Sequence, residues 1–404
     1  MPEYIKKRKG ILDMDNFVFN SPTYFCFGKD TENEAGALVK KFGGSKVLIH
    51  YGGGSAVKSG LIDRVKASLD RENIPYILLG GVQPNPRSGL VYKGIELCRK
   101  EKVDFILAVG GGSAIDSSKA IAGGVPYDGD FWDHHSGKPV EKALPVGTVL
   151  TIAAAGSEGS GNTVITHENG MLKRGCRTEI LRPKFSIMNP SLTCTLPAFQ
   201  TACGITDILA HLYERYITDT KEVEVTDRVI EALMLTVVKE GRRVIADPYN
   251  YEARANIMWA GTLAHNNVCG VGRRQDWNSH ALEHELSGLY DCAHGAGLAV
   301  VMPAMFTYIY EKDVMRFAQV AVRVWGCEMN FENPKETALE GIERLKNFLS
   351  SIGMPVTFSE LGARQEDIPY LVDTLCDGNG RPGYIEGYLK LDKEDCTNIY
   401  KLML

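Results

Sequence analysis

The chain has 404 residues, of which 44% are hydrophobic and 24% charged, a composition typical of a globular protein with two or three domains. Its net charge of −5 gives no basic surface for nucleic acid, and the short basic run at residues 6–10 is better explained as a solvated tail. The sequence has no signal peptide, no run of 18 apolar residues and no CxxC pair among its ten cysteines, so we expect a reduced cytoplasmic protein without a membrane partner.

Short apolar runs alternate with helical patterns in the first half of the chain. Each run is typical of a strand buried in a parallel sheet, and the segments between the runs carry apolar residues at helical spacing. The strands are predicted at residues 46–51, 76–82 and 104–110, and the helices at residues 55–73, 88–102 and 113–124. This alternation predicts βαβ units in a Rossmann-like α/β domain with a doubly wound, mostly parallel sheet.

Two of the predicted strands end in matching glycine runs, GGGS at residues 52–55 and GGGS at residues 110–113. Glycine lets the backbone approach a ligand closely, and the N–H groups that begin the next helix face an anion. Neither run matches G-x-G-x-x-G, but both lie where open α/β sheets bind ligands, at the carboxyl ends of strands. The pair therefore predicts nucleotide binding, against the alternative that tight turns simply need glycine.

The first glycine run also bears on the choice of cofactor. NAD-selective sites place Asp or Glu beside the adenine ribose, where the carboxylate accepts from the 2′-hydroxyl and repels a 2′-phosphate. After this run the chain has Ser55 and Lys58, and the first carboxylate is that of Asp63. A small loop without a carboxylate has room for a phosphate, so we expect NADP(H) rather than NAD(H).

From Thr195 onward the pattern becomes helical. A helix is predicted over residues 195–218, with Thr195 as its N-cap and Pro197 in its first turn. Further helices are predicted at residues 225–245, 250–268, 278–290 and 295–313. We therefore expect an α/β dinucleotide-binding domain over residues 1–194, an all-helical domain over residues 195–404, and an active site in the cleft between them.

Several polar side chains in the helical half have the types and spacings of a metal site. Asp207 and His211 are four residues apart on one predicted helix, so they share a helix face. His280 and His284 have the same spacing on a later helix, and His294 lies just before the next one. Three imidazoles and one carboxylate among apolar neighbours suit zinc or ferrous iron. The alternative is that such pairs are ordinary surface or capped-core contacts.

Four motifs together resemble those of the iron-containing alcohol dehydrogenase family, and most closely its branch of NADPH-dependent butanol dehydrogenases and aldehyde reductases. They are GGGSAIDSSK, AAAGSEGSGN, GITDILAHLYERY, and the His-x13-His spacing from His280 to His294. The resemblance extends from about Phe17 to the C-terminus, and Asp-x3-His followed by His-x13-His is specific in combination. It implies a dehydroquinate synthase-like architecture of one α/β and one helical domain.

The resemblance also implies a role for each matching residue. The residues implied in metal binding are Asp207, His211, His280 and His294. The residues implied in cofactor binding are Gly52, Gly53, Gly54, Ser55, Asn85, Gly111, Gly112, Ser113, Asp116, Thr151 and Lys173. His284 matches a histidine that binds no metal but lies near it and the nicotinamide, so it is the candidate for protonating the product oxygen. Without the resemblance, Lys173 would be interpreted as a solvated loop lysine.

One stretch departs from the family pattern. Relatives usually read Thr-Leu-Pro-Ala-Thr-Gly-Ser-Glu, whereas this chain reads TIAAAGSE from Thr151, with Ala153 and Ala155 at the third and fifth positions. The second threonine hydroxyl is missing, so one hydrogen bond to the cofactor is either lost or made by Ser157 or Ser160.

Four further histidines match no functional position of the family, and the role of two tryptophans stays open. His265 is expected in the core or between helices. The histidines expected in loops are His134, His135 and His167. Trp132 and Trp277 either line the substrate pocket or simply pack against neighbours.

The activity that the resemblance implies is reversible hydride transfer between NADP(H) and short aliphatic alcohols and aldehydes of the butanol and butanal type. It implies a homodimer with one divalent metal, ferrous iron first, and zinc, manganese or nickel as alternatives. Two other functions stay open on this architecture: a glycerol dehydrogenase or dehydroquinate synthase-like enzyme, and a non-catalytic nucleotide-binding protein. The first thirteen residues have no counterpart in the family, so Met14 is a candidate start of the natural chain.

Overall fold

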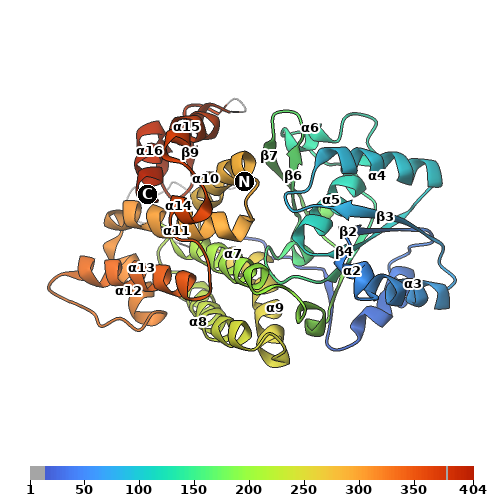
Figure 1. Cartoon of the computed structure of the whole chain (residues 1–404), viewed down its shortest axis with the longest axis horizontal. Helices are drawn as coiled ribbons and strands as arrows, with labels where there is room; N and C mark the ends of the chain where they lie inside the picture. The colour runs from blue at the N-terminus through green and yellow to red at the C-terminus, as the bar shows by residue number, and fades with distance from the viewer. Residues whose placement is uncertain (1–13, 379–380) are drawn as a thin grey trace.

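The structure is a computed structural model that describes residues 14–378 and 381–404, so the basic run at residues 6–10 lies outside it. Figure 1 shows two parts: one holds the strands and helices of the first half, the other holds the helices of the second half, and α7 (Ala198–Tyr216) runs along the middle. Within the described ranges, no helix combines the length and the apolar character needed to cross a membrane.

The first half is built around a parallel sheet whose strands, in the described part of the chain, lie in the order β1-β8-β5-β4-β2-β3. The bounds are β1 Tyr24–Phe27, β2 Val47–Gly52, β3 Tyr76–Val82, β4 Phe105–Gly110, β5 Val146–Leu150 and β8 Phe185–Met188. The predicted parallel sheet is confirmed, and the three strands predicted from the sequence are found to within one residue at each end.

Helices cover both faces of this sheet because its central strands are apolar on both sides. Val47 and Leu107 pack into the core on one face, whereas Leu48 and Ile106 pack into the core on the other. The first face is covered by α1 (Ala35–Lys41) and α3 (Leu61–Arg71), the second by α4 (Ser88–Glu101) and α5 (Gly112–Gly124). This is the doubly wound arrangement that the sequence predicts.

Two local details of the first half differ from expectation. The helix predicted over residues 55–73 is wrong as a single element: it divides into α2 (Ser55–Lys58) and α3, because Gly60 adopts a φ of +71° between them. An antiparallel hairpin, β6 (Asn162–His167) and β7 (Leu172–Arg177), was not predicted. The short helix α6 (Trp132–His135) was not predicted either.

The second half is helical, as predicted. Its longer helices are α7, α8 (Glu224–Ala246), α9 (Tyr251–His265), α10 (Asn278–Tyr290), α11 (His294–Ile309), α12 (Val314–Arg323), α13 (Pro334–Ser351), α15 (Ile368–Asp377) and α16 (Lys393–Lys401). They share one large apolar core, with the single turn α14 (Phe358–Leu361) also packed into it. Two three-residue strands, β9 (Tyr384–Glu386) and β10 (Lys390–Asp392), form a short antiparallel pair among these helices that was not predicted.

The start of α7 corrects one prediction. Thr195 was expected to be the N-cap, but the helix begins at Ala198 and Pro197 occupies the cap position with an extended ψ of 144°. A proline disfavours helical backbone in the residue before it, so Leu196 and Thr195 stay outside the helix.

Candidate active site

A cavity of about 510 Å³ lies between the α/β part and the helical part, lined by side chains from both. The predicted site residues that line it are Asn85, Gly112, Ser113, Asp116, Lys173, Asp207, His211, His280, His284 and His294. The other predicted residues, Gly52, Gly53, Gly54, Ser55, Gly111 and Thr151, are not among its lining residues. The cavity therefore brings together all the expected metal-binding residues and the end of the second glycine run, Gly112 and Ser113, while no residue of the first glycine run lines it.

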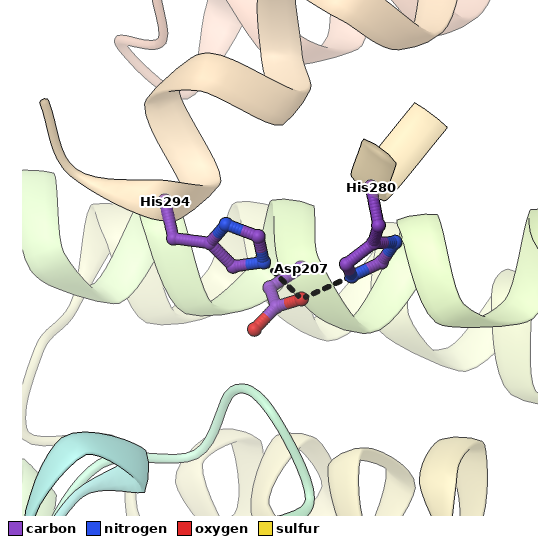
Figure 2. Close-up of side chains that lie close together, drawn as sticks. All are labelled: Asp207, His280 and His294. Carbon is purple, nitrogen blue, oxygen red and sulfur yellow. Dashed lines mark ion pairs between the residues drawn. The ribbon is translucent and has the colours of Figure 1, made fainter. Parts of the chain in front are cut away.

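Histidine rings from three helices converge on Asp207, which α7 presents to the cavity. His211 Nδ1 and His280 Nε2 each lie 3.6 Å from Asp207 Oδ1, and His294 Nε2 lies 3.7 Å from the same atom. Figure 2 shows two of these approaches, with Asp207 between His280 of α10 and His294 at the start of α11. His211 reaches the same point because it follows Asp207 by one helical turn.

These separations fit ligands of one cation better than hydrogen bonds. A separation of 3.6 Å is too long for a hydrogen bond, and two ligands at about 2.1 Å from one tetrahedral metal lie about 3.4 Å apart. Among the described residues, three of the four converging atoms are buried without a hydrogen-bond partner: Asp207 Oδ1, His211 Nδ1 and His280 Nε2. Burying polar atoms without partners is costly, and a bound divalent cation would remove that cost.

Two buried glutamates that sequence reasoning missed lie behind the histidines. Glu214 of α7 accepts a hydrogen bond from His280 Nδ1, and Glu283 of α10 accepts one from His294 Nδ1. A signal for both was present, since Glu214 follows His211 by three residues and Glu283 follows His280 by three. That spacing places each glutamate about one turn from a candidate ligand, although it does not reveal which histidine the glutamate contacts.

A second set of possible ligand atoms, from Glu283, His284 and His294, also lies within 4.8 Å. It is a poorer cation site for two reasons. Glu283 Oε2 already accepts from His294 Nδ1, and the Lys173 ammonium lies 3.6 Å from the same carboxylate oxygen. A neighbouring positive charge opposes a cation, so the geometry favours the set around Asp207.

His284 also lines the cavity, but it is not one of the three histidines whose ring nitrogens converge on Asp207 Oδ1. Its ring centroid lies 5.8 Å from that of His294 and 6.3 Å from that of His280. Burial lowers the pKa of His284 well below its usual value, and the Lys173 ammonium lowers it further. His284 is therefore a neutral imidazole at neutral pH, with one ring nitrogen that can donate a hydrogen bond and one that can accept.

The cofactor side of the cavity is braced by a buried network. Lys119 Nζ donates to the backbone oxygens of Ser157, Ser160 and Asn162 at 2.7 to 2.9 Å, and so fixes the loop that follows β5. Asp116 accepts from Ser157 Oγ at 2.5 Å. The Asp116 carboxylate lines the cavity, but its hydrogen bonds hold this loop in place.

Comparisons with known proteins identify the family of the chain. Residues 22–190 match the family "Iron-containing alcohol dehydrogenase", and residues 201–404 match "Fe-containing alcohol dehydrogenase family, C-terminal". The chain belongs to the iron-containing alcohol dehydrogenase family.

Relatives in this family match along nearly the whole chain. NADH-dependent butanol dehydrogenase A of Clostridium acetobutylicum is 40% identical, over 96% of this chain and 99% of that protein. NADPH-dependent aldehyde reductase YqhD of Escherichia coli is 35% identical, over 90% of this chain and 93% of that protein. The crystal structure of NADH-dependent butanol dehydrogenase A from Thermotoga maritima superposes with a TM-score of 0.93 at 41% identity, covering 97% and 99% of the two chains. The protein is thus an oxidoreductase of the alcohol dehydrogenase and aldehyde reductase class.

Of the two positions at which this chain departs from the family pattern, Ala155 lines the cavity and Ala153 does not. Ala155 faces the start of α5, where a Cβ on Gly112 would lie 3.3 Å from the Ala155 Cβ. Of the two proposed substitutes for the missing hydroxyl, Ser157 is bonded to Asp116 and Lys119. Ser160 also lines the cavity, and its buried Oγ has no hydrogen-bond partner in the described ranges, so Ser160 is the better candidate.

The lysine of the hairpin corrects one alternative interpretation. Lys173 belongs to β7, and its side chain is 7% exposed, so it is no solvated loop lysine. Among the aromatic residues, Trp277 lines the cavity, whereas Trp132 stacks on His135 outside it.

Three of the remaining histidines differ from expectation, and a fourth agrees with it. His134 and His135 are buried in α6 and His167 ends β6, so the expectation that they lie in loops is wrong. His265 ends α9 and contacts Arg215 of α7, which makes it the expected interhelix histidine, although it also lines the cavity.

Proposed function

We propose that the protein catalyses reversible hydride transfer between NADP(H) and short aliphatic aldehydes or alcohols of the butanal and butanol type, using one divalent metal ion, with ferrous iron as the first candidate. The convergence of three imidazole nitrogens on Asp207 Oδ1, in a cavity that also contains Gly112 and Ser113, carries this proposal. Zinc, manganese and nickel suit the same ligand types, so metal supply contributes to the choice.

Four side chains would hold the metal in this proposal, namely Asp207, His211, His280 and His294. A divalent cation there supplies Lewis-acid stabilisation of negative charge on the substrate oxygen, and the nicotinamide supplies or accepts the hydride. The protein's own contribution is positioning. The start of α5 and the loop braced by Lys119 form the wall opposite these ligands, so a cofactor bound there faces the same small volume.

His284 would handle the proton. Reduction of an aldehyde places negative charge on its oxygen, and the product alcohol needs one proton there. His284 lines the cavity, and burial keeps its imidazole neutral, so it can pass a proton from solvent to the substrate oxygen and take one back in the reverse direction.

The preference for NADP(H) is supported by the loop at Gly52–Ser55. Gly53 and Gly54 leave open space where side chains would stand, and Ser55 begins α2 with its free N–H groups. The relatives are divided, since the butanol dehydrogenases are named NADH-dependent and YqhD is named NADPH-dependent. Comparing the rates with NADPH and with NADH therefore tests this loop separately from the enzyme class.

The assembly, the compartment and the domain boundary belong to the same proposal. A homodimer is supported by Phe17, Val18 and Phe19, which are 52%, 88% and 45% exposed in the segment before the edge strand β1. A reducing cytoplasm is supported by the ten cysteines, all of which are free within the described residues. We place the domain boundary at residues 194 and 195, in the connection between β8 and α7.

The test is an anaerobic assay of the protein reconstituted with ferrous iron and given butanal. The rate at which NADPH is oxidised is followed by its absorbance and compared with the rate for NADH. We expect oxidation that is faster with NADPH and is abolished by a chelator. Faster oxidation of NADH would keep the enzyme class and contradict the cofactor preference. No turnover with either cofactor would contradict the proposed reaction and favour a non-catalytic nucleotide-binding protein.

A further inference from the structure

Two buried glutamates stand behind the proposed metal ligands, one on each of two neighbouring helices. Glu214 of α7 and Glu283 of α10 have fully buried side chains. Glu214 accepts a hydrogen bond from His280 Nδ1, and Glu283 accepts one from His294 Nδ1. In both histidines the other ring nitrogen, Nε2, faces Asp207. The two contacts therefore have the same chemistry on two different rings.

This arrangement decides which nitrogen of each ring is free. A neutral imidazole carries one proton, and a carboxylate hydrogen-bonded at Nδ1 keeps that proton there. The lone pair of Nε2 then faces Asp207 Oδ1, where the other ligand atoms converge. A carboxylate in that position also makes the ring a stronger donor to a cation and restricts its rotation.

We propose that Glu214 and Glu283 are positioning residues for the metal ion, an inference that rests on the metal site proposed above. Each glutamate holds one histidine in the tautomer and orientation that a cation needs. Neither glutamate contacts the cation itself, because its carboxylate lies on the far side of the imidazole.

The two glutamates also connect the three helices that carry the ligands. Glu214 reaches from α7 to α10, and its Oε1 accepts from the His280 backbone N–H at 2.9 Å, so it fixes both the ring and the helix that bears it. Glu283 reaches from α10 to the first residue of α11, and its other oxygen accepts from Ser287 Oγ. The spacing between the ligands is therefore set by hydrogen bonds as well as by apolar packing.

The third histidine is held differently. The ring of His211 lies 4.2 Å from that of His265, and it is its Nδ1 that faces Asp207. Its orientation follows from its place on α7, one turn after Asp207, and from this ring contact. We therefore expect the two glutamates to act through His280 and His294 only.

Glu283 also forms an ion pair with Lys173. The Lys173 ammonium lies 3.6 Å from Glu283 Oε2, and both side chains are buried. Replacing Glu283 with glutamine would leave the Lys173 charge without this carboxylate, close to a metal-binding histidine. The added repulsion toward a cation should reinforce the loss of ligand orientation.

The test measures metal affinity directly. Metal-stripped wild type, Glu214→Gln and Glu283→Gln would be titrated with cobalt(II) against a competing chelator, and binding followed by the visible absorption of the bound cobalt. We expect each variant to bind cobalt about 10- to 100-fold more weakly than the wild type. The absorption bands should also shift, because an imidazole that is free to rotate changes the ligand field.

Glu231→Gln is the matched control. Glu231 is also a buried glutamate on a helix of the same domain, but it accepts from Tyr216 and Arg323, away from the cavity. We expect this variant to lower the melting temperature without changing cobalt affinity. A loss of affinity in all three variants would assign the effect to general destabilisation and overturn the proposal.

The remaining outcomes separate this inference from the proposed function. Wild type that binds no cobalt, or binds it equally well as Asp207→Asn, would contradict the metal site itself. Wild type that binds cobalt while both glutamine variants bind it equally tightly would contradict only the positioning role. If a glutamine variant does not fold, the Glu→Asp variant retracts the carboxylate by one methylene, and an unchanged affinity there would also overturn the proposal.

Discussion

The Cα of Gly295 lies so close to Cys203 that a Cβ on Gly295 would stand 2.1 Å from the Cys203 carbonyl oxygen. Gly295 is the second residue of α11, directly after His294, and Cys203 lies one turn before Asp207 on α7. The glycine thus lets the two ligand-bearing helices meet backbone to backbone at the proposed metal site.

Gly295→Ala should therefore separate α11 from α7. Backbone atoms cannot move aside as a flexible side chain does, so we expect a loss of about 3 kcal/mol in the free energy of unfolding, together with weaker metal binding. Gly241→Ala is the control, because its Cβ would stand 3.4 Å from side-chain atoms of Ile205 and Phe348, which is ordinary contact. Denaturant unfolding and metal titration of both variants measure the effect, and equal stability of the two would contradict it.

The two histidines of α10 should separate metal binding from proton transfer. We expect His280→Ala to lose metal and activity together, because its Nε2 faces Asp207 Oδ1. We expect His284→Ala to keep its metal while turnover falls about 10²- to 10⁴-fold, the usual contribution of a positioned acid or base. Metal analysis beside the turnover number of each variant distinguishes the roles. An active His280 variant with full metal content would end the assignment of that ligand.

His50 of β2 should make the stability of the α/β part depend on pH. Its Nδ1 lies 2.8 Å from the Leu79 carbonyl oxygen and its Nε2 lies 2.8 Å from Ser117 Oγ. Burial lowers the pKa of His50 from 6.5 to about 4. Between these values the unfolded state binds the proton and the folded state does not, so stability is fully present above the unfolded pKa and falls as the pH drops toward 4.

Because of His50, the free energy of unfolding should fall by about 2 kcal/mol between about pH 7 and about pH 5. Urea unfolding of wild type and His50→Gln at both pH values measures it, and the informative quantity is the change with pH in each protein. The variant should lose about 2 kcal/mol less than the wild type over this interval. The same change in both proteins would show that His50 is protonated in the folded state.

The elements that could be predicted from the sequence are those whose signal is local. The strand predicted at residues 104–110 consists of consecutive apolar residues. The structure confirms it because apolar cores cover both faces of the sheet at this strand. Asp207 and His211 could be paired because four residues make one helical turn. The parallel sheet and the helical second half follow from patterns of this kind, whereas the full ligand set was assigned through the resemblance to the family.

Other features were missed for two different reasons. The β6–β7 hairpin had a local signal, Asn169-Gly170 after the alternating segment NTVITH, but no strand was predicted there. The contact between Glu214 and His280 joins residues 66 positions apart, so it depends on how α7 and α10 pack. No local pattern specifies that packing, which is why the glutamates behind the ligands required the structure.

Restoring the family's threonine at position 155 should tighten cofactor binding. Ala155 lines the cavity beside Gly112, where a hydroxyl could donate to a bound cofactor. One added hydrogen bond contributes about 1 kcal/mol, so Ala155→Thr should lower the KM for the cofactor about fivefold. Ala155→Val has the same shape without the hydroxyl and serves as control. If Ser160 has taken over the bond, Ser160→Ala should weaken cofactor binding in the wild type and less so in Ala155→Thr.

The first glycine run offers the sharpest test of cofactor choice. In the described part of the chain no atom lies within 4 Å of a Cβ placed on Gly53, and its φ is not positive, so aspartate fits there without strain. Its carboxylate would repel a 2′-phosphate and accept from a 2′-hydroxyl. A repulsion of about 1 to 4 kcal/mol at contact distance predicts that Gly53→Asp lowers the ratio of kcat/KM for NADPH to that for NADH at least about fivefold.

Gly53→Asn separates charge from size, because asparagine fills the same space without the negative charge. It should change the two kcat/KM values far less than aspartate does, and added salt should reduce the difference between the two variants, since screening weakens the repulsion. A ratio that stays constant in both variants would mean that the adenosine end of the cofactor does not reach this loop. The cofactor would then have to be held by the cavity wall around Gly112 and Ser113 alone. The carboxylate in that wall, Asp116, already accepts a hydrogen bond from Ser157 Oγ.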